Sequence, residues 1–560
     1  MADARTLKQR LHARLEALKS ERSAWVDEWQ QISAFIAPDR GRFTRSERGS
    51  RKRTRKILNE RATQDLNTLA SGMAAGLTTP SQPWFKLTAE DQDLAESGAV
   101  RVWLEAAETL VAKVLAKSNF YQSVTSLYKE MGAFGTGALW HDEDFETVSR
   151  FYPFSIGEFA LANDERGRAT TCYRELELTV EQTVARFGLA NVSQAVRNLY
   201  DGGSYDRWVP VVHAVEPYGP RFADRKDARR WAWVSVYYEP GGEGDRLLSL
   251  KGYDDCPVHA PRWDLVLPDA YGTGPGHLAL ASVKDLQALE RRISQAVDHK
   301  VHPALQGPPS LQAPDRLPGS YNPVAAGQGQ RIEPLYDQRA FSIQEALLRQ
   351  QATEQRIDRS FYADLFLMLA MSDRRQITAR EIEERHEEKL LQLGPVLTRL
   401  NDELLNGVID RVFGIAVRAS QPFWARGEAG MLPPPPPELE GRDLKVEYLS
   451  ALQQAARAVG VLGVQRLAAF VGEVSQFDPT ARYKLDTHQA IDDVAERLGV
   501  SARIVRPDED VAAMLEQDAA QAQAAQAAQM AQVGADAAAK LGRAQMQGTA
   551  LGALAGNANG

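Results

Sequence analysis

The first part of the chain shows apolar residues at intervals of three, four or seven positions, a spacing that predicts amphipathic helices. The first such stripe runs from Leu7 to Ile36, and Pro38 should end the helix because proline cannot continue the backbone hydrogen-bond ladder. Two further stripes cover residues 62–77 and 103–115. The N-terminal portion is therefore predicted to be mainly helical.

The pattern changes after about residue 145. Short segments rich in β-branched and aromatic residues cover 170–178, 209–215, 231–238 and 247–253, and turn residues separate them. Such segments predict strands of a mixed or antiparallel sheet. Both alternating faces of 231–238 are bulky, so this strand should be covered on both sides. The predicted fold class is mainly α with a β-rich part, that is, α+β.

Two long helices are predicted next, over residues 278–302 and 341–369. They flank a stretch rich in Pro and Gly at 306–329, so they should form an antiparallel pair with a compact non-helical insert at its far end. The apolar residues of the second helix, Leu347, Leu348, Ile357, Phe361, Tyr362 and Phe366, occupy more than one stripe. One partner helix cannot cover that much apolar surface, so neighbouring copies are expected.

The remaining C-terminal sequence is also predicted to be helical. Thr378 and Glu381 form a capping box at the start of a helix that should run to about 417, with a kink at Gly394-Pro395. Prolines 433–437 predict a stiff spacer, and helical spacing resumes over 446–505. The last fifty residues are rich in Ala and Gln, which predicts a marginal helix or a disordered tail.

Composition and charge narrow the function classes. The 560 residues are 44% hydrophobic with a formal net charge of −8, which is a globular composition and an acidic one. Net acidity argues against tight wrapping around nucleic acid, so any DNA contact should be local or loose. No apolar run is long enough for a membrane span, and the first residues do not resemble a signal peptide.

One segment departs from this acidity. Residues 40–56 contain nine basic residues and a single acid, Glu47, with Gly and Ser between them. This composition predicts an exposed loop. A solvated loop and a contact for phosphates or an acidic partner are equally compatible with this pattern. The basic residues are Arg40, Arg42, Arg45, Arg48, Arg51, Lys52, Arg53, Arg55 and Lys56.

Catalytic motifs give no positive signal. The phosphate-binding loop of NTPases does not occur, and Gly272, Gly274 and Gly276 have the wrong spacing for a dinucleotide fingerprint, which predicts a flexible turn. Two acid pairs, Asp142/Asp144 and Asp254/Asp255, could hold a divalent ion, although loop acids are usually only solvated. We therefore expect no enzyme, no cofactor and no metal; a metal-dependent hydrolase built on these acids is the enzymatic alternative.

The order of these features resembles the portal proteins of tailed bacteriophages, and more narrowly the head-to-tail connecting proteins of short-tailed phages. The resemblance covers residues 20–415. It is carried by Trp25, Trp29 and Ile36-Ala37-Pro38; Leu69-Ala70-Ser71-Gly72-Met73; Pro83-Trp84-Phe85-Lys86-Leu87; Tyr271-Gly272-Thr273-Gly274-Pro275-Gly276; His302-Pro303; Thr378-Ala379-Arg380-Glu381; and Leu393-Gly394-Pro395-Val396-Leu397.

The resemblance implies a division of the chain into named parts. These are a wing (1–275), a first stem helix (276–302), a clip (303–340), a second stem helix (341–369), a channel loop (370–378), a kinked wing helix (379–418), a crown (419–510) and a C-terminal barrel helix or tail (511–560). It also implies a ring of twelve copies at one capsid vertex of the virion, assembled in the host cytoplasm, with DNA passing through the axial channel.

The implied partners are further copies of the chain, double-stranded DNA, the large terminase subunit, the major capsid and scaffold proteins, and tail adaptor proteins; no membrane is involved. The family's channel-lining loop would correspond to Arg374, Arg375 and Gln376, although two arginines in a loop could equally be only solvent-exposed. The alternative from another class is a helical DNA-binding scaffold or tail component without a closed channel.

Overall fold

The structure is a computed structural model, which describes residues 6–44, 56–89, 98–222, 227–301, 343–371, 392–439, 444–450 and 467–487, together with a few short pieces between and beyond them. The chain divides into two compact units, Met1–Ala456 and Arg457–Gly560, each of which is taken by itself here.

The described N-terminal residues contain the helices α1 (Leu7–Phe35), α2 (Arg61–Leu77), α4 (Gly98–Lys117) and α5 (Phe120–Phe134). The apolar spacing predicted the first three, and α5 is an addition. Thr6 and Gln9 form a reciprocal capping box that satisfies free amides at the start of α1. The first stripe of α1, Leu7, Leu11, Leu15 and Leu18, packs on a β-sheet, and its later residues Trp29 and Ile32 join the main core.

Two antiparallel sheets follow. The larger has the strand order β4-β5-β6-β7-β8 and the smaller β3-β2-β9. The bounds are β2 (Ala138–Asp144), β3 (Val148–Phe154), β4 (Phe159–Asn163), β5 (Ala169–Thr179), β6 (Trp208–Pro217), β7 (Trp233–Tyr238), β8 (Ser249–Tyr253) and β9 (Val258–His259). Strands β5 to β8 confirm the four predicted strand segments, and consecutive residues 234–236 of β7 are buried, as expected for a strand covered on both sides.

Short helices pack on the larger sheet. Helices α6 (Val180–Phe187) and α7 (Gln194–Asp201) lie between β5 and β6, and they bury Val180, Val192 and Val196 against Val209 and Val211 of β6. Two 3-10 turns, η3 (Pro220–Phe222) and η4 (Ala228–Arg230), lie between β6 and β7.

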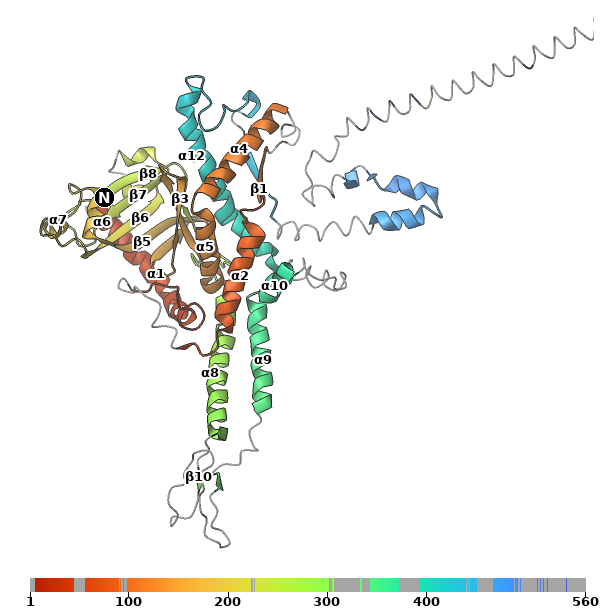
Figure 1. Ribbon diagram of the computed structural model, residues 1–560. Helices are drawn as coiled ribbons and strands as arrows, with labels where there is room; N and C mark the ends of the chain where they lie inside the picture. The colour runs from red at the N-terminus through yellow and green to blue at the C-terminus, as the bar shows by residue number, and fades with distance from the viewer. Residues whose placement is uncertain are drawn as a thin grey trace, which may run out of the picture. The chain divides into compact units, whose positions relative to one another are not determined.

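A two-helix rod extends from this body (Figure 1). It consists of α8 (Pro275–Val301) and α9 (Ile343–Ser360), which pack side by side. The chain between them includes a short antiparallel pair, β10 (Leu305–Gln306) with β11 (Glu333–Pro334), while the rest of residues 302–342 lies outside the described residues.

The second rod helix differs from the continuous helix predicted over 341–369. It breaks at Tyr362, whose φ of 53° lies in the left-handed region, and α10 (Ala363–Met371) then begins in a new direction. The break lets Phe366 of α10 pack on Gly72 of α2, where an added Cβ would lie 2.2 Å from the phenyl ring. Tertiary packing has therefore overridden an unbroken helical repeat.

The late helix of the first unit is also irregular, but at another place than predicted. Residues 392–400 are helical through Gly394-Pro395, a π-helical turn covers Asn401–Leu405, and α12 (Asn406–Trp424) follows. The extra residue of a π turn, rather than the proline, produces the irregularity among these residues. The capping box at Thr378 and Glu381 lies outside the described residues.

The prediction of a helix from residue 446 is wrong at its start. Residues Leu444–Tyr448 form strand β12, which pairs antiparallel with β1 (Phe85–Ala89), and the Trp103 indole donates to the carbonyl of Pro433. The chain thus returns to the N-terminal helices before the first unit ends at Ala456. In the second unit, residues 467–474 are helical and a 3-10 turn covers Pro479–Lys484; most of the last fifty residues lie outside the described part.

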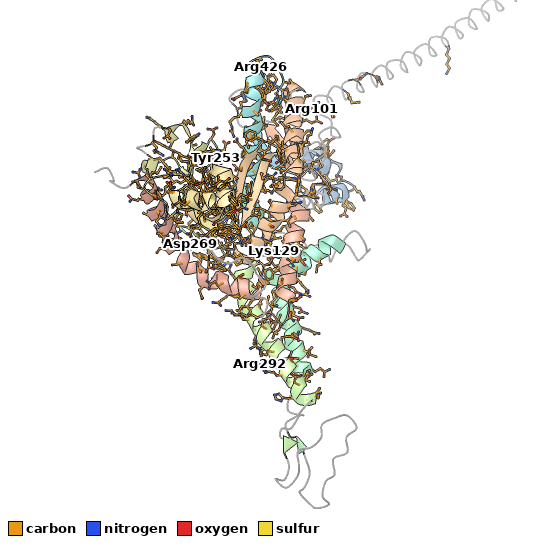
Figure 2. All side chains as sticks on the ribbon, turned by 60° about the vertical axis from the view of Figure 1, so that its left-hand side comes forward. Arg101, Lys129, Tyr253, Asp269, Arg292 and Arg426 are labelled. Atoms are coloured by element: carbon orange, nitrogen blue, oxygen red, sulfur yellow. The ribbon has the colours of Figure 1, made fainter. Side chains whose placement is uncertain are left out.

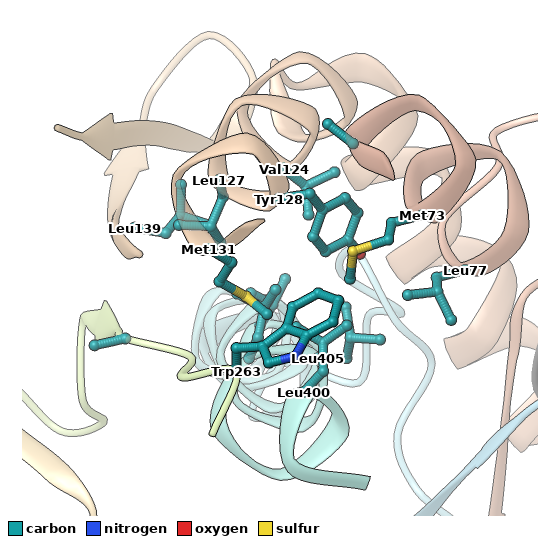
Figure 3. Packing of buried hydrophobic residues seen from close by; sticks show 14 of the residues in the cluster. Met73, Leu77, Val124, Leu127, Tyr128, Met131, Leu139, Trp263, Leu400 and Leu405 are labelled. Carbon is teal, nitrogen blue, oxygen red and sulfur yellow. The ribbon is translucent and has the colours of Figure 1, made fainter. Parts of the chain in front are cut away.

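The main core lies where α2, α5 and the π-helical turn meet. Figure 3 shows Met73 and Leu77 of α2 and Tyr128 and Met131 of α5 facing Leu400 and Leu405, with Trp263 beside them. Close backbone contacts support this core: a Cβ on Gly274 would lie 2.9 Å from the Cα of Gly135, whose φ is +68°. The segment expected to be a flexible turn is therefore a tightly packed one, because only glycine permits this approach.

Candidate assembly surface and DNA-channel site

The distal half of the rod carries apolar side chains that nothing described covers. Val297 and Val301 of α8 and Leu347 and Leu348 of α9 are all exposed, the last with 63% of its surface in contact with solvent. Nearer the body, Ile293 and Ile357 are buried. An exposed apolar surface of this kind indicates a contact with other protein.

The prediction of excess apolar surface on the second rod helix is thus confirmed for one half only. Ile357, Phe361 and Phe366 are buried within the chain itself. Leu347 and Leu348, which precede Ile357 by more than two helical turns on α9, remain exposed. The sequence pattern could not separate the two sets, since both fit a helical stripe.

The rod is attached to the body by amide side chains. Gln287 of α8 accepts from the backbone amides of Leu58 and Asn59 at 2.6 and 3.0 Å, and its own amide donates to the carbonyl of Asn59. The Gln350 amide of α9 donates to both Glu290 and Glu354. The chain that follows the basic segment is therefore held directly on the rod.

Charged residues reinforce this junction. Arg61, the first residue of α2, donates from Nε and Nη2 to the two carboxylate oxygens of Asp358 at 2.6 and 2.7 Å, a bidentate pair. This hydrogen bonding raises the pKa of Arg61 above its usual value. Burial, together with the neighbouring carboxylate of Asp358, raises the pKa of Asp65 to about 7. The junction thus holds one carboxyl that is partly protonated at neutral pH.

The structure places three of the nine basic residues predicted as a contact loop. Arg40 is half-buried and lies 3.6 Å from Glu130, a buried acid on α5; burial raises the pKa of Glu130 to about 7. Arg42 is exposed and pairs with Glu158, and the Lys56 ammonium lies over the Phe35 ring. Arg40 therefore has a structural contact; the other six residues, 45–55, lie outside the described part of the chain.

The predicted channel residues Arg374, Arg375 and Gln376 also lie outside the described residues. Their flanks are placed: α10 ends at Met371, and helix resumes at residue 392. The rod itself presents several cations to solvent, among them Arg291 and Arg292 of α8 and Arg349 of α9; Figure 2 shows Arg292 on the outside of the rod.

A buried ion pair that sequence reasoning did not single out locks the π-helical turn to the sheets. Arg262 is fully buried, and its Nε and Nη2 donate to the carboxylate of Glu403 at 3.1 and 2.6 Å. Its remaining donors reach Asn163 and the carbonyl of Gly167 in the turn after β4. The π turn presents Glu403 to this arginine, and no local motif signals the contact because the partners are 141 residues apart.

The acid pairs considered as a metal site are engaged by other groups. Asp142 accepts from the Tyr253 hydroxyl, and Asp144 accepts from Thr147 and Arg150. Asp254 and Asp255 both lie beside Arg418. Within the described residues no group of three or more His, Cys, Asp or Glu side chains has the arrangement of a metal site.

None of the described helices combines the length and apolarity needed to cross a bilayer.

These features define a structural assembly subunit: a helical and β-sheet body that carries a rod with an uncovered apolar half. Residues 8–505 match the family model of the bacteriophage head to tail connecting protein, and the chain belongs to that family. It is 41% identical over 542 residues to a probable portal protein of Bordetella phage BPP-1, covering 96% of each chain. It is 40% identical over 549 residues to the portal protein of Salmonella phage epsilon15, covering 97% of this chain and 96% of the relative.

Solved structures give a weaker likeness. A chain from the virion of a native gene transfer agent particle is 12% identical, with a TM-score of 0.32, and a chain from the neck of an empty particle of that kind is 14% identical, with a TM-score of 0.35. Each comparison covers 79% of this chain and 94% of the other. Such low TM-scores add nothing to the family assignment.

Proposed function

We propose that this chain is a phage portal subunit, which forms a ring of twelve copies at one capsid vertex and surrounds the channel through which DNA is packaged and ejected. The uncovered apolar half of the rod, with Val301 and Leu348 as its most exposed members, is the observation that carries this proposal. Family membership supports it, since two relatives with about the same length are named as portal proteins.

In this proposal the described elements take the parts of a portal. Helices α8 and α9 are the stem, and the chain between them, residues 302–342, is the clip that docks the large terminase subunit and later the tail adaptors. The body is the wing, which meets the major capsid and scaffold proteins. The crown is residues 419–510 in this proposal, and the first compact unit ends within that range, at Ala456. The mature location is the portal vertex of the virion.

In this proposal the residues that contact DNA in the channel are Arg374, Arg375 and Gln376. Each copy carries a formal net charge of −8. A duplex would therefore be centred by a few basic residues and not held, because each neutralised phosphate adds affinity through counterion release. Replacing both arginines by alanine is expected to leave ring assembly unchanged and to reduce DNA packaging or retention. Loss of rings in that variant would show that the two arginines are structural.

End-on electron micrographs of the purified protein test the proposal. Closed rings with a bore as wide as duplex DNA are the expected result. Monomers or open assemblies that still bind DNA would instead favour the scaffold or tail component without a closed channel. Magnesium-dependent DNA cleavage that is lost when Asp142, Asp144, Asp254 and Asp255 are replaced would favour the hydrolase.

A further inference from the structure

A cluster of arginines lies at the β8 edge of the larger sheet, away from the rod. Arg229 and Arg230 are exposed on η4, and Arg225 is half-buried just before it. None of the three forms an ion pair with a described residue, and the Nε of Arg225 is buried without a hydrogen-bond partner. We call Arg225, Arg229, Arg230 and the adjoining Trp231 the arginine platform.

The platform is held in place by close packing. A Cβ added to Gly252 of β8 would lie 2.1 Å from Cγ of Trp231, so the indole rests directly on the strand backbone. The Arg230 guanidinium lies 4.5 Å from the centre of the indole ring, a cation–π contact. Arg221 pairs with Glu216 at 2.7 Å and fixes the start of the same connection. The exposed cations are therefore positioned in advance of any partner.

An acidic hairpin lies at the same end of β8. The turn between β2 and β3 presents a completely exposed Phe145 between Asp144 and Glu146, and both acids lie within ion-pair distance of Arg150. The Tyr253 hydroxyl donates to Asp142 of this hairpin at 3.1 Å, and Tyr253 directly follows Gly252. Because successive strand residues point to opposite faces, the platform and the hairpin flank the β8 edge on its two sides.

We propose that this edge is a docking surface for another protein, which places an acidic segment on the arginine platform and an apolar side chain on Phe145 of the hairpin. Arginine and aromatic residues are the side chains most enriched at the centre of protein interfaces. Arg225, Arg229 and Arg230 form no ion pair with a described residue, so an outside carboxylate would meet them without displacing a described acid.

The same charges make duplex DNA the poorer occupant. A duplex presents one negative charge per about 1.7 Å along its axis, so a duplex that spans the β8 edge would also meet the acids of the hairpin on the other side. A nucleic-acid base would also have to compete for the Trp231 indole, because the indole already packs on the backbone at Gly252 and contacts the Arg230 guanidinium. A polypeptide can alternate its charges to suit both sides of the edge. The proposal does not depend on ring formation.

Fluorescence anisotropy with the full-length protein tests this surface. The probe is a short labelled peptide in which Glu-Asp pairs alternate with Leu, and a short DNA duplex of matched net charge serves as competitor. The variant R229E/R230E is expected to bind the peptide roughly tenfold more weakly, because two exposed ion pairs are each replaced by a repulsion. The matched control R291E/R292E makes the same charge change on α8 and is expected to leave the affinity within about twofold.

Three outcomes would overturn the proposal. Equal losses in both variants would show that only the overall charge matters. Preferential loss of duplex binding in R229E/R230E would make the edge a nucleic-acid site. Unlabelled wild-type protein that displaces the labelled peptide more strongly than unlabelled peptide does would assign the edge to a second copy of the chain. If R229E/R230E does not fold, R229Q/R230Q removes the cations without introducing acids and should still weaken peptide binding.

Discussion

Removing the two exposed leucines of the rod should weaken ring assembly by a predictable amount. Leu347 and Leu348 have 44% and 63% of their surface exposed, so together they offer roughly one whole leucine of apolar surface to a neighbour. Burying one such side chain contributes about 1.5–3 kcal/mol. The double variant L347A/L348A keeps only part of this surface.

The expected consequence is a shift in the concentration at which rings form. Because each 1.4 kcal/mol corresponds to about a tenfold change in an equilibrium constant, half-assembly should need roughly tenfold more protein or more. Mass photometry on a dilution series of the purified protein measures this concentration directly.

A matched control separates the rod surface from general surface effects. Val266 and Leu267 are also consecutive and exposed, but they lie in a loop of the body at its cis-proline turn. The variant V266A/L267A should assemble as the wild type does. Rings of L347A/L348A that form at the wild-type concentration would refute the assignment of the distal rod as an assembly surface.

Three further predictions concern the body. E403A should lower the free energy of unfolding by about 3–5 kcal/mol, because it leaves the buried guanidinium of Arg262 without its carboxylate. The double variant R262M/E403L should recover much of this loss. Urea denaturation measures the free energy of unfolding of both variants. G72A should destabilise the contact of α2 with α10, since its Cβ would lie 2.2 Å from Phe366, while G98A, with open space around it, should not; the melting temperature compares them. For Asp65, the folded-state pKa of about 7 lies above the unfolded value of 3.8, so its contribution to stability is complete below about pH 3.8 and is lost as the pH rises through about 7. D65N should therefore flatten this part of the stability profile in melts from pH 4 to 8, and an unchanged slope would contradict the raised pKa of Asp65.

Local features of the sequence determined most of the secondary structure. The stripe from Leu7 to Ile36 predicted α1, and the β-branched segments predicted β5 to β8, because burial of one face imposes a period that a short window reveals. The long rod helix α8 was predicted on the same basis. The order of these elements was enough to suggest the family.

Only the tertiary structure decided the contacts between distant segments. The break at Tyr362 interrupts a regular four-residue spacing because Phe366 packs on Gly72, nearly 300 positions earlier in the chain. Strand β12 forms where helical spacing was expected because β1 offers it an edge, and Arg262 meets Glu403 through a π turn. Periodicity records which face of a segment is buried, whereas the partner that buries it is set by packing across the whole fold.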